Sequence, residues 1–197
     1  MKAERHVKGC KRSSAQPWLK DVMCKVGPSP KHGLGVFATK DIKPFTLITL
    51  YPADGAKVWP NPDLDDAYVL WEFEGMTRDV RRVYSSSVPP LLGCELEIVG
   101  DPSAIKDPIF VGHMCNDACK MTKPEQAEIY EKMTLKGLNA QIGMVPWEAN
   151  SDESLFEAMG IWCRRPIKAG EEIFVTYGAK YWLALMELQS VDLQTMD

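Results

Sequence analysis

The sequence predicts a mainly β domain with a few helices. Short apolar runs broken by turn residues follow one another from residue 31 onward, and β-branched and aromatic residues are concentrated in them. This pattern of short apolar runs between turn residues is typical of strands. Helical periodicity is confined to two segments, so the alternation of strands and helices that marks an α/β protein is not present.

Several segments are predicted as strands, and none of them is long. In chain order they are residues 36–38, 46–51, 68–73, 96–99, 161–163 and 173–177. The core is therefore expected to be a collection of short strands.

Two segments are predicted as helices. The first begins near Thr122, which precedes Glu125 with the spacing of a capping box, and it ends at Gly137. The second begins after Gly178 and has an apolar face to bury. That face is formed by Tyr181, Leu185 and Leu188, with Trp182 and Leu183 beside them.

Charge is divided unevenly between a basic beginning and an acidic remainder. Residues 1–31 carry eight Lys and Arg residues against two acidic ones, so the rest of the chain has a net charge of −10 within a total of −4. We interpret residues 1–30 as a basic N-terminal arm, for which substrate docking, nucleic-acid contact and simple solubility all stay open as roles. An acidic body favours a Lys- or Arg-rich peptide partner, and ordinary solubilising charge explains the same pattern.

Length and composition indicate one soluble globular domain with extensions. The chain has 197 residues, of which 45% are hydrophobic and 25% charged, and this excludes gross disorder. No apolar run reaches the length of a membrane span, and charged residues follow Met1 where a signal peptide would have its apolar core. The six cysteines form no dense framework. We therefore expect reduced thiols and an intracellular, soluble protein without membrane contact.

Three short motifs contain the candidate functional residues. The first, at residues 32–38, has Gly33 and Gly35 spaced so that a backbone can come close to a ligand. It matches part of a dinucleotide fingerprint, but such a fingerprint follows a strand and opens a helix, whereas Pro28 and Pro44 flank this one. On its own the motif predicts only a turn.

The second motif is the polar stretch at residues 110–117, and the third is at residues 167–178. In the second, His113 and two neighbouring cysteines could donate to zinc, but structural zinc takes four ligands and no tight second pair lies nearby. No metal is expected.

The third motif is a turn followed by a strand that ends at Tyr177, and taken alone it predicts a core strand with a buried tyrosine.

Together, and in this order, the three motifs resemble those of the SET-domain methyltransferases. The resemblance runs from about residue 31 to Trp182 and is closest in the third motif, which reads G-E-E-I-x-x-x-Y-G. It implies a SET-domain fold of small sheets with a C-terminal pseudoknot-like threading, plus an inserted helix and a C-terminal helix. The implied organisation is an arm at 1–30, a SET domain at 31–178 with an insertion at about 117–138, and a helical segment at 179–197 that closes the site.

The resemblance also implies an activity. It is the transfer of a methyl group from S-adenosyl-L-methionine to a lysine of a histone tail or another basic protein segment, by an enzyme of chromatin and hence of the nucleus. Tyr177 and Tyr51 are the implied catalytic residues. The implied cofactor-binding residues are His32, Gly33, Leu34, Gly35, Gly112, His113, Tyr177 and Trp182.

The central motif departs from the family pattern R-F-x-N-H-S-C-x-P-N. Ile109 replaces the Arg, Gly112 the Asn and Met114 the Ser, while Asn139 resembles the Asn that closes the motif after the insertion. The cysteine-rich flanks of the family are missing, so the resemblance implies no zinc. Two other functions stay open: a SET-fold protein that binds cofactor or peptide without turnover, and a lysine methyltransferase of a non-histone protein.

Overall fold

Strands dominate the computed structural model, which describes residues 21–31, 33–59, 68–71, 76, 85–91, 94–145 and 158–194. The strands are β1 (Cys24–Pro28), β2 (Leu34–Ala38), β3 (Leu47–Leu50), β4 (Gly55–Trp59), β5 (Tyr68–Trp71), β6 (Ser85–Leu91), β7 (Cys94–Val99), β8 (Asn116–Asp117), β9 (Ala140–Val145), β10 (Ala158–Cys163) and β11 (Phe174–Val175). The helices are α2 (Ala127–Gly137) and α3 (Ala179–Gln194), with 3-10 turns η1 (Pro108–Phe110), η2 (Gly112–Met114) and η3 (Pro124–Gln126). The predicted mainly β fold with a few helices is confirmed.

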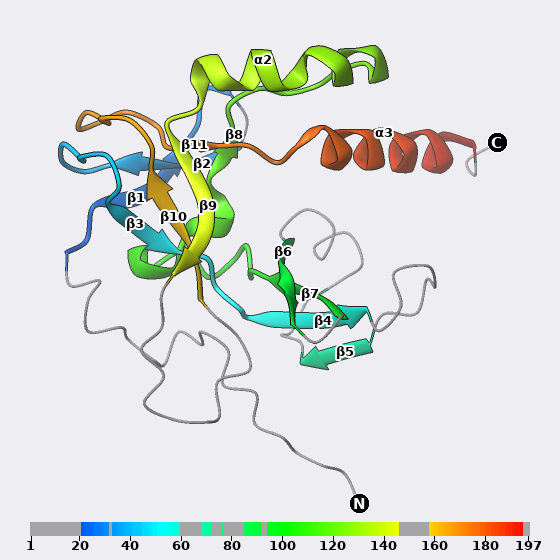
Figure 1. Cartoon of the computed structure of the whole chain (residues 1–197), viewed down its shortest axis with the longest axis horizontal. Coiled ribbons are helices and arrows are strands. Elements are labelled where there is room, and N and C mark those ends of the chain that lie inside the picture. The colour runs from blue at the N-terminus through cyan, green and yellow to red at the C-terminus, as the bar shows by residue number, and fades with distance from the viewer. Residues whose placement is uncertain are drawn as a thin grey trace, which may run out of the picture.

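Within these residues the strands form four small sheets (Figure 1). β1 pairs antiparallel with β2, and β10 lies between β3 and β9 in a second antiparallel sheet. A third antiparallel sheet has the strand order β5-β4-β7-β6, and the short strands β8 and β11 pair in parallel. In Figure 1 α3 extends from the body beside α2, with which it is in contact.

Each predicted strand segment contains or overlaps an observed strand, but the structure adds strands that the sequence did not indicate. These are β1, β4, β6, β8 and β9. β6 contains Pro89 and Pro90, and the sheet tolerates their missing N–H donors because β6 lies at an edge. The segment predicted at 173–177 shortens to the two residues of β11.

The folded part of the chain begins before the boundary at residue 30 that the sequence suggested. β1 pairs with β2 from Cys24↔Ala38 to Pro28↔Leu34, and Cys24 is fully buried. The boundary is corrected accordingly: residues 24–28 belong to the fold. Gly27 and Pro28 give this strand the composition of a loop, and only its pairing with β2 identifies it.

The inserted helix is preceded by the turn η3, and its cap differs from the predicted one. Gln126, not Glu125, reaches back to the start of the turn. Its Oε1 accepts hydrogen bonds from the backbone N–H groups of Thr122 and Lys123 at 2.7 and 3.2 Å. These bonds satisfy donors that the start of a helix leaves without partners. α2 ends and α3 begins where the sequence predicts.

Residues 170–175 are threaded between β2 and β8. On one side the Ile173 N–H donates to Val36 O at 2.7 Å, and the Ala38 N–H donates to Glu171 O at 2.9 Å. On the other side β11 pairs with β8, and the next N–H along, that of Ala118, donates to Val175 O at 2.9 Å. This is the C-terminal threading that the family resemblance implied.

The largest core cluster joins the three sequence motifs. Val36, Val111 and Val175 come from the first, second and third motif, and each is at most 1% exposed. Burial of a valine side chain stabilises a fold by about 1.5–3 kcal/mol, so the motifs are held together by packing before any ligand is considered. Among the described helices, neither is long and apolar enough to cross a membrane.

Candidate active site

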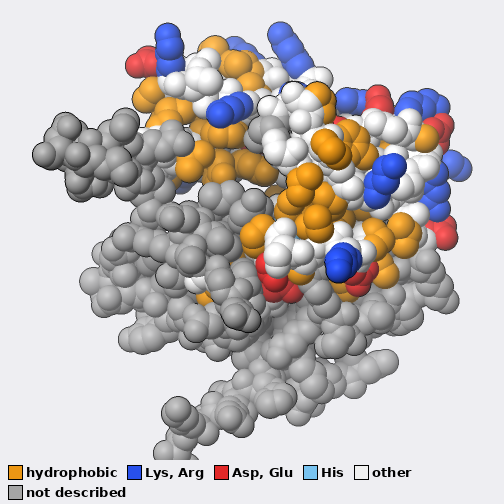
Figure 2. All heavy atoms as spheres, turned by 180° about the vertical axis from the view of Figure 1, so that it is seen from behind, with side chains coloured by type: hydrophobic (Ala, Val, Ile, Leu, Met, Phe, Trp, Pro, Cys, Tyr) orange, Lys and Arg blue, Asp and Glu red, His pale blue; other side chains and the backbone are white. Residues whose placement is uncertain are grey.

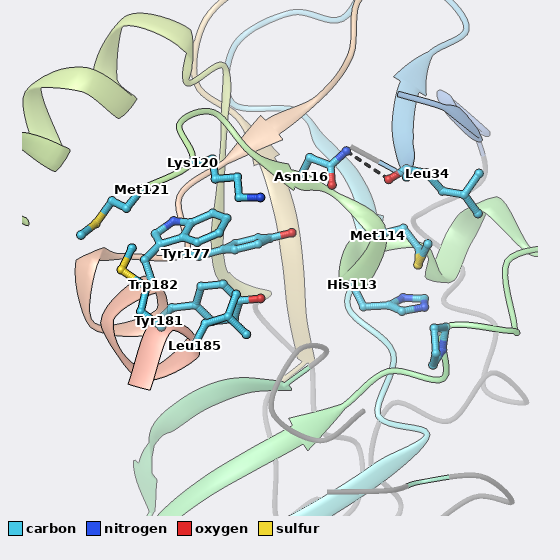
Figure 3. A pocket seen from close by; sticks show the side chains of 13 residues that line it. Leu34, His113, Met114, Asn116, Lys120, Met121, Tyr177, Tyr181, Trp182 and Leu185 are labelled. Carbon is cyan, nitrogen blue, oxygen red and sulfur yellow. Dashed lines mark hydrogen bonds between the residues drawn. The ribbon is translucent and has the colours of Figure 1, made fainter. Parts of the chain in front are cut away.

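A cavity of about 510 Å³ opens between the start of α3 and the segment that carries η2. Figure 3 shows Tyr177, Tyr181, Trp182 and Leu185 on one side of it and His113 and Met114 on the other. Figure 2 shows hydrophobic side chains gathered around the hollow on this face of the molecule. Its volume lies within the roughly 300–1,000 Å³ that is usual for small-ligand sites. The lining is completed by Gly33, Leu34, Pro102, Asn116, Lys120, Met121 and Met186.

Tyr177 is held at the cavity wall by hydrogen bonds at both ends. Its hydroxyl donates to the backbone oxygen of Cys115 at 2.8 Å, and its backbone N–H donates to Asp117 Oδ2 at 3.0 Å. Burial, and after it the neighbouring Tyr181, raises the pKa of Tyr177 well above its usual 10.0. The phenol therefore stays protonated at neutral pH, with its proton directed at a carbonyl and its oxygen lone pairs left as acceptors.

Aromatic rings of the α3 start surround Tyr177. The Tyr181 ring meets it edge-on at 4.8 Å between centroids, and the Trp182 ring stacks at 6.1 Å with an interplanar angle of 24°. The Trp182 indole N–H donates to Asp117 Oδ2 at 2.8 Å, so the ring cannot turn without losing this bond. The wall is therefore both apolar and fixed in orientation.

The opposite side of the site is built on Asn116 and the glycine motif. Asn116 Nδ2 donates to the backbone oxygen of Leu34 at 3.0 Å and to Glu172 Oε1 at 2.8 Å (Figure 3 shows the first bond). A Cβ at Gly35 would lie 2.2 Å from that Glu172 oxygen. Gly35 is thus needed for the close approach of Glu172 and Asn116, not for contact with the cavity.

The central motif contributes His113 to the cavity and buries its neighbours. His113 Nε2 lies 2.9 Å from the backbone oxygen of Asp101, and the Tyr51 ring meets the imidazole edge-on at 6.2 Å. Tyr51 is 4% exposed, packs with Ala53, Ile98 and Met159, and does not line the cavity. Gly112 is also buried away from it: a Cβ there would lie 2.8 Å from Leu50 O.

The structure thus brings together part of the predicted site. Gly33, Leu34, His113, Tyr177 and Trp182 line the cavity, whereas Gly35, Gly112 and Tyr51 do not. His32 lies outside the described residues. Each of Gly35 and Gly112 is required by neighbouring protein atoms, and a cofactor contact at either glycine stays a prediction.

Sequence reasoning missed Asn116, Lys120 and Asp117 as site residues. Lys120 points toward the space between Tyr177 and Asn116 (Figure 3), and among the described lining residues it alone is a Lys, Arg, Asp or Glu. Within the described part of the chain, no group of three or more His, Cys, Asp or Glu side chains is placed to hold a metal ion. The nearby Cys115 is a buried thiol whose pKa burial raises well above 9.0.

Fold and cavity together define a small β domain with a partly open site for a small molecule next to a half-buried tyrosine. The family model of the SET domain matches residues 33–178, so the chain belongs to the SET-domain family, whose members are generally methyltransferases that use S-adenosylmethionine. Among solved structures 115 chains match significantly. One is a Plasmodium falciparum protein named provisionally as a histone methyltransferase, which is 18% identical, with 82% of this chain and 98% of that chain covered and a TM-score of 0.42. A comparison with curated protein sequences gives no significant match.

The lining fits the cofactor that the family uses. An adenine ring needs an apolar, aromatic wall, which Tyr181 and Trp182 provide. The amino-acid end of the cofactor needs a cation for its carboxylate, and Lys120 is such a cation. Its amine needs polar acceptors, which the backbone around Leu34 offers. The cavity has room for such a molecule by volume.

Proposed function

We propose that the chain is an S-adenosylmethionine-dependent protein-lysine N-methyltransferase that acts on a histone tail or another basic protein segment. The observation that carries the proposal is the Tyr177 hydroxyl, a protonated phenol beside a backbone carbonyl at the wall of a cavity that fits the cofactor. Family membership supports methyl transfer in general. The acidic body of the chain, −10 without residues 1–31, favours a basic substrate segment.

Tyr177 would act by orientation. S-adenosylmethionine, when bound, supplies a methyl group on a positively charged sulfur. The hydroxyl of Tyr177 donates to Cys115 O, so its lone pairs can accept a hydrogen bond from a lysine amine and weak C–H···O contacts from a methyl group. Alignment of a nucleophile with its target can lower a barrier by up to about 7–11 kcal/mol, which is the main contribution expected of this site.

The lysine must react as a neutral amine. Low-polarity surroundings disfavour an ammonium, and the aromatic rings around Tyr177 provide them. The described lining contains no carboxylate that could serve as a base, and the imidazole of His113 lies against Asp101 O. We therefore assign proton removal to solvent water, and expect the rate to rise with pH as more of the lysine is deprotonated.

One experiment tests the proposal. The full chain is incubated with methyl-labelled cofactor and a pool of core histones, and with a pool of basic non-histone proteins, and the modified residue is mapped by mass spectrometry. Label on a lysine supports the proposal, and the pool that carries it decides between histone and non-histone substrates. The Tyr177→Phe variant is the matched control: it should bind S-adenosylhomocysteine like the wild type and transfer no methyl group. Cofactor binding without transfer to either pool would refute the enzyme and support a binding protein, and full activity of Tyr177→Phe would refute the role of this tyrosine.

A further inference from the structure

Asp117 is a buried carboxylate that joins three separate parts of the chain. It is 1% exposed and lies on β8, directly opposite Val175 of β11. One of its oxygens, Oδ2, accepts from the Tyr177 backbone N–H, from the Trp182 indole N–H and from the Tyr130 hydroxyl. Such charge-assisted bonds are stronger than neutral ones, and here they converge on a single atom.

The third donor comes from the inserted helix α2. Tyr130 is 1% exposed, and its hydroxyl oxygen also lies 3.1 Å from Thr176 Oγ1. Burial, and then the bond to Asp117, raises the pKa of Tyr130, so its hydroxyl keeps the proton that it donates. Neither Asp117 nor Tyr130 lines the cavity, although both contact residues that adjoin or form its wall.

The other carboxylate oxygen ties Asp117 to the insertion as well. Oδ1 accepts from the Cys119 N–H at 2.9 Å and from Thr134 Oγ1 of α2 at 3.3 Å. Asp117 stands at the start of the insertion predicted at about 117–138, and the bond to Thr134 joins it to α2 within that insertion.

We propose that Asp117 is a positioning residue through which the inserted helix α2 fixes Tyr177 and Trp182 in the active site. The inference rests on the proposed function in that Tyr177 is taken to orient the reacting groups. Asp117 acts through the two residues that it holds and does not touch a ligand. Loss of Tyr130 as a donor frees the carboxylate to shift, and both Tyr177 and Trp182 shift with it.

The test separates positioning from stability. Tyr130→Phe removes only the hydroxyl. Ile42→Val, at a buried core position whose backbone bonds go to Ile167, serves as a control with a similar loss of stability. Calorimetric titration with S-adenosylhomocysteine counts the competent sites, and the methyl-transfer rate is divided by that count. Because a hydrogen bond to a charged group corresponds to roughly a tenfold to hundredfold effect, we expect Tyr130→Phe to lose about tenfold or more in rate per site, with an unchanged site count. Ile42→Val should keep the wild-type rate per site, and an unchanged rate per site in Tyr130→Phe would overturn the proposal.

A second measurement does not depend on methyl transfer. The Trp182 indole N–H is identified in the NMR spectrum by its absence from Trp182→Phe, and its exchange with solvent is followed in the wild type, Tyr130→Phe and Ile42→Val. We expect about tenfold faster exchange in Tyr130→Phe alone. If the wild type neither binds cofactor nor transfers methyl groups, the proposed function fails, and this exchange rate still decides whether α2 anchors Trp182 through Asp117. Equal exchange in all three proteins would refute the anchoring.

Discussion

Restoring the family residue at Gly112 should damage the protein instead of improving it. The family has Asn at this position, so Gly112→Asn is the substitution that would repair a degenerate motif. In the structure, however, a Cβ at residue 112 would lie 2.8 Å from Leu50 O and 3.0 Å from Ile161 Cγ1, where ordinary contacts are 3.4–4 Å. Leu50 O belongs to the backbone of β3 and cannot move away without disturbing the sheet.

The expected loss can be estimated in two steps. Forcing an extra carbon into a packed site costs about 1–3 kcal/mol, and burying an amide without a full set of partners adds about 1–3 kcal/mol. Gly112→Ala should therefore lower the free energy of unfolding by about 1–3 kcal/mol, and Gly112→Asn by about 2–6 kcal/mol. For a chain of this length these losses correspond to melting temperatures lower by roughly 2–12 °C and 4–24 °C.

The assay is thermal unfolding of the two variants, together with calorimetric titration of S-adenosylhomocysteine. Gly27→Ala is the control, because a Cβ there would lie 3.5 Å from Phe37 Cδ2, an ordinary contact. It should leave the free energy of unfolding unchanged or raise it by at most about 1 kcal/mol. Gly112→Asn with a wild-type melting temperature and tighter cofactor binding would show that Gly112 is a lost cofactor contact and not a packing requirement.

Three further predictions follow from the site and the core. Lys120→Gln should weaken S-adenosylhomocysteine binding about two- to fivefold at low salt and less at high salt, as expected for an exposed charge pair. The control is Lys123→Gln, at an exposed lysine that is not in the lining, and it should leave binding unchanged. Equal effects of the two substitutions would contradict the role of Lys120. Tyr51→Phe should leave cofactor affinity unchanged, because Tyr51 itself does not line the cavity, and should slow methyl transfer through the catalytic role that the family resemblance implies; a loss of affinity in calorimetry would count against this placement. Burial raises the pKa of Cys24 from 9.0 to about 12, so between pH 9 and 12 the thiol ionises in the unfolded chain but not in the folded protein. The stabilising contribution of the buried neutral thiol is therefore complete below pH 9 and is lost between pH 9 and 12 at about 1.4 kcal/mol per pH unit. Denaturant unfolding across this range should show a shallower decline for Cys24→Ala, and an identical slope would show that the buried thiol is not responsible.

The fold class could be predicted because local patterns carry it. Apolar runs such as that of β3 and the helical stripe of α3 are visible in the sequence. β1 and β6 were missed because Gly and Pro give them the composition of loops, and pairing with a neighbouring strand decides their structure. The cap of α2 was assigned to Glu125 by spacing alone, whereas the geometry of η3 presents Gln126 to the free N–H groups.

The candidate site was only partly predictable, because some of its residues are brought together by tertiary contacts that no local pattern shows. Tyr177 lies in the third motif and Trp182 follows it at the end of the family resemblance, and both line the cavity. Asp117 has no such signal, because its donors come from α2, from the second residue after β11 and from α3, and only the tertiary fold assembles them. At Gly35 and Gly112 the glycine pattern indicates close approach without indicating what approaches, and the structure shows protein atoms at the Cβ position of both.

The threading of residues 170–175 between β2 and β8 also has a consequence for how the protein is made. A nascent chain without this segment lacks the partner that β2 and β8 share, so Tyr177, the Cys115 carbonyl and the aromatic wall come together only after residues 170–182 have been synthesised. Pairing between segments so distant in the chain gives a high contact order, which is associated with folding over milliseconds to seconds. Until that pairing is complete the apolar faces of the three motifs stay exposed, which leaves the chain open to aggregation and to chaperones.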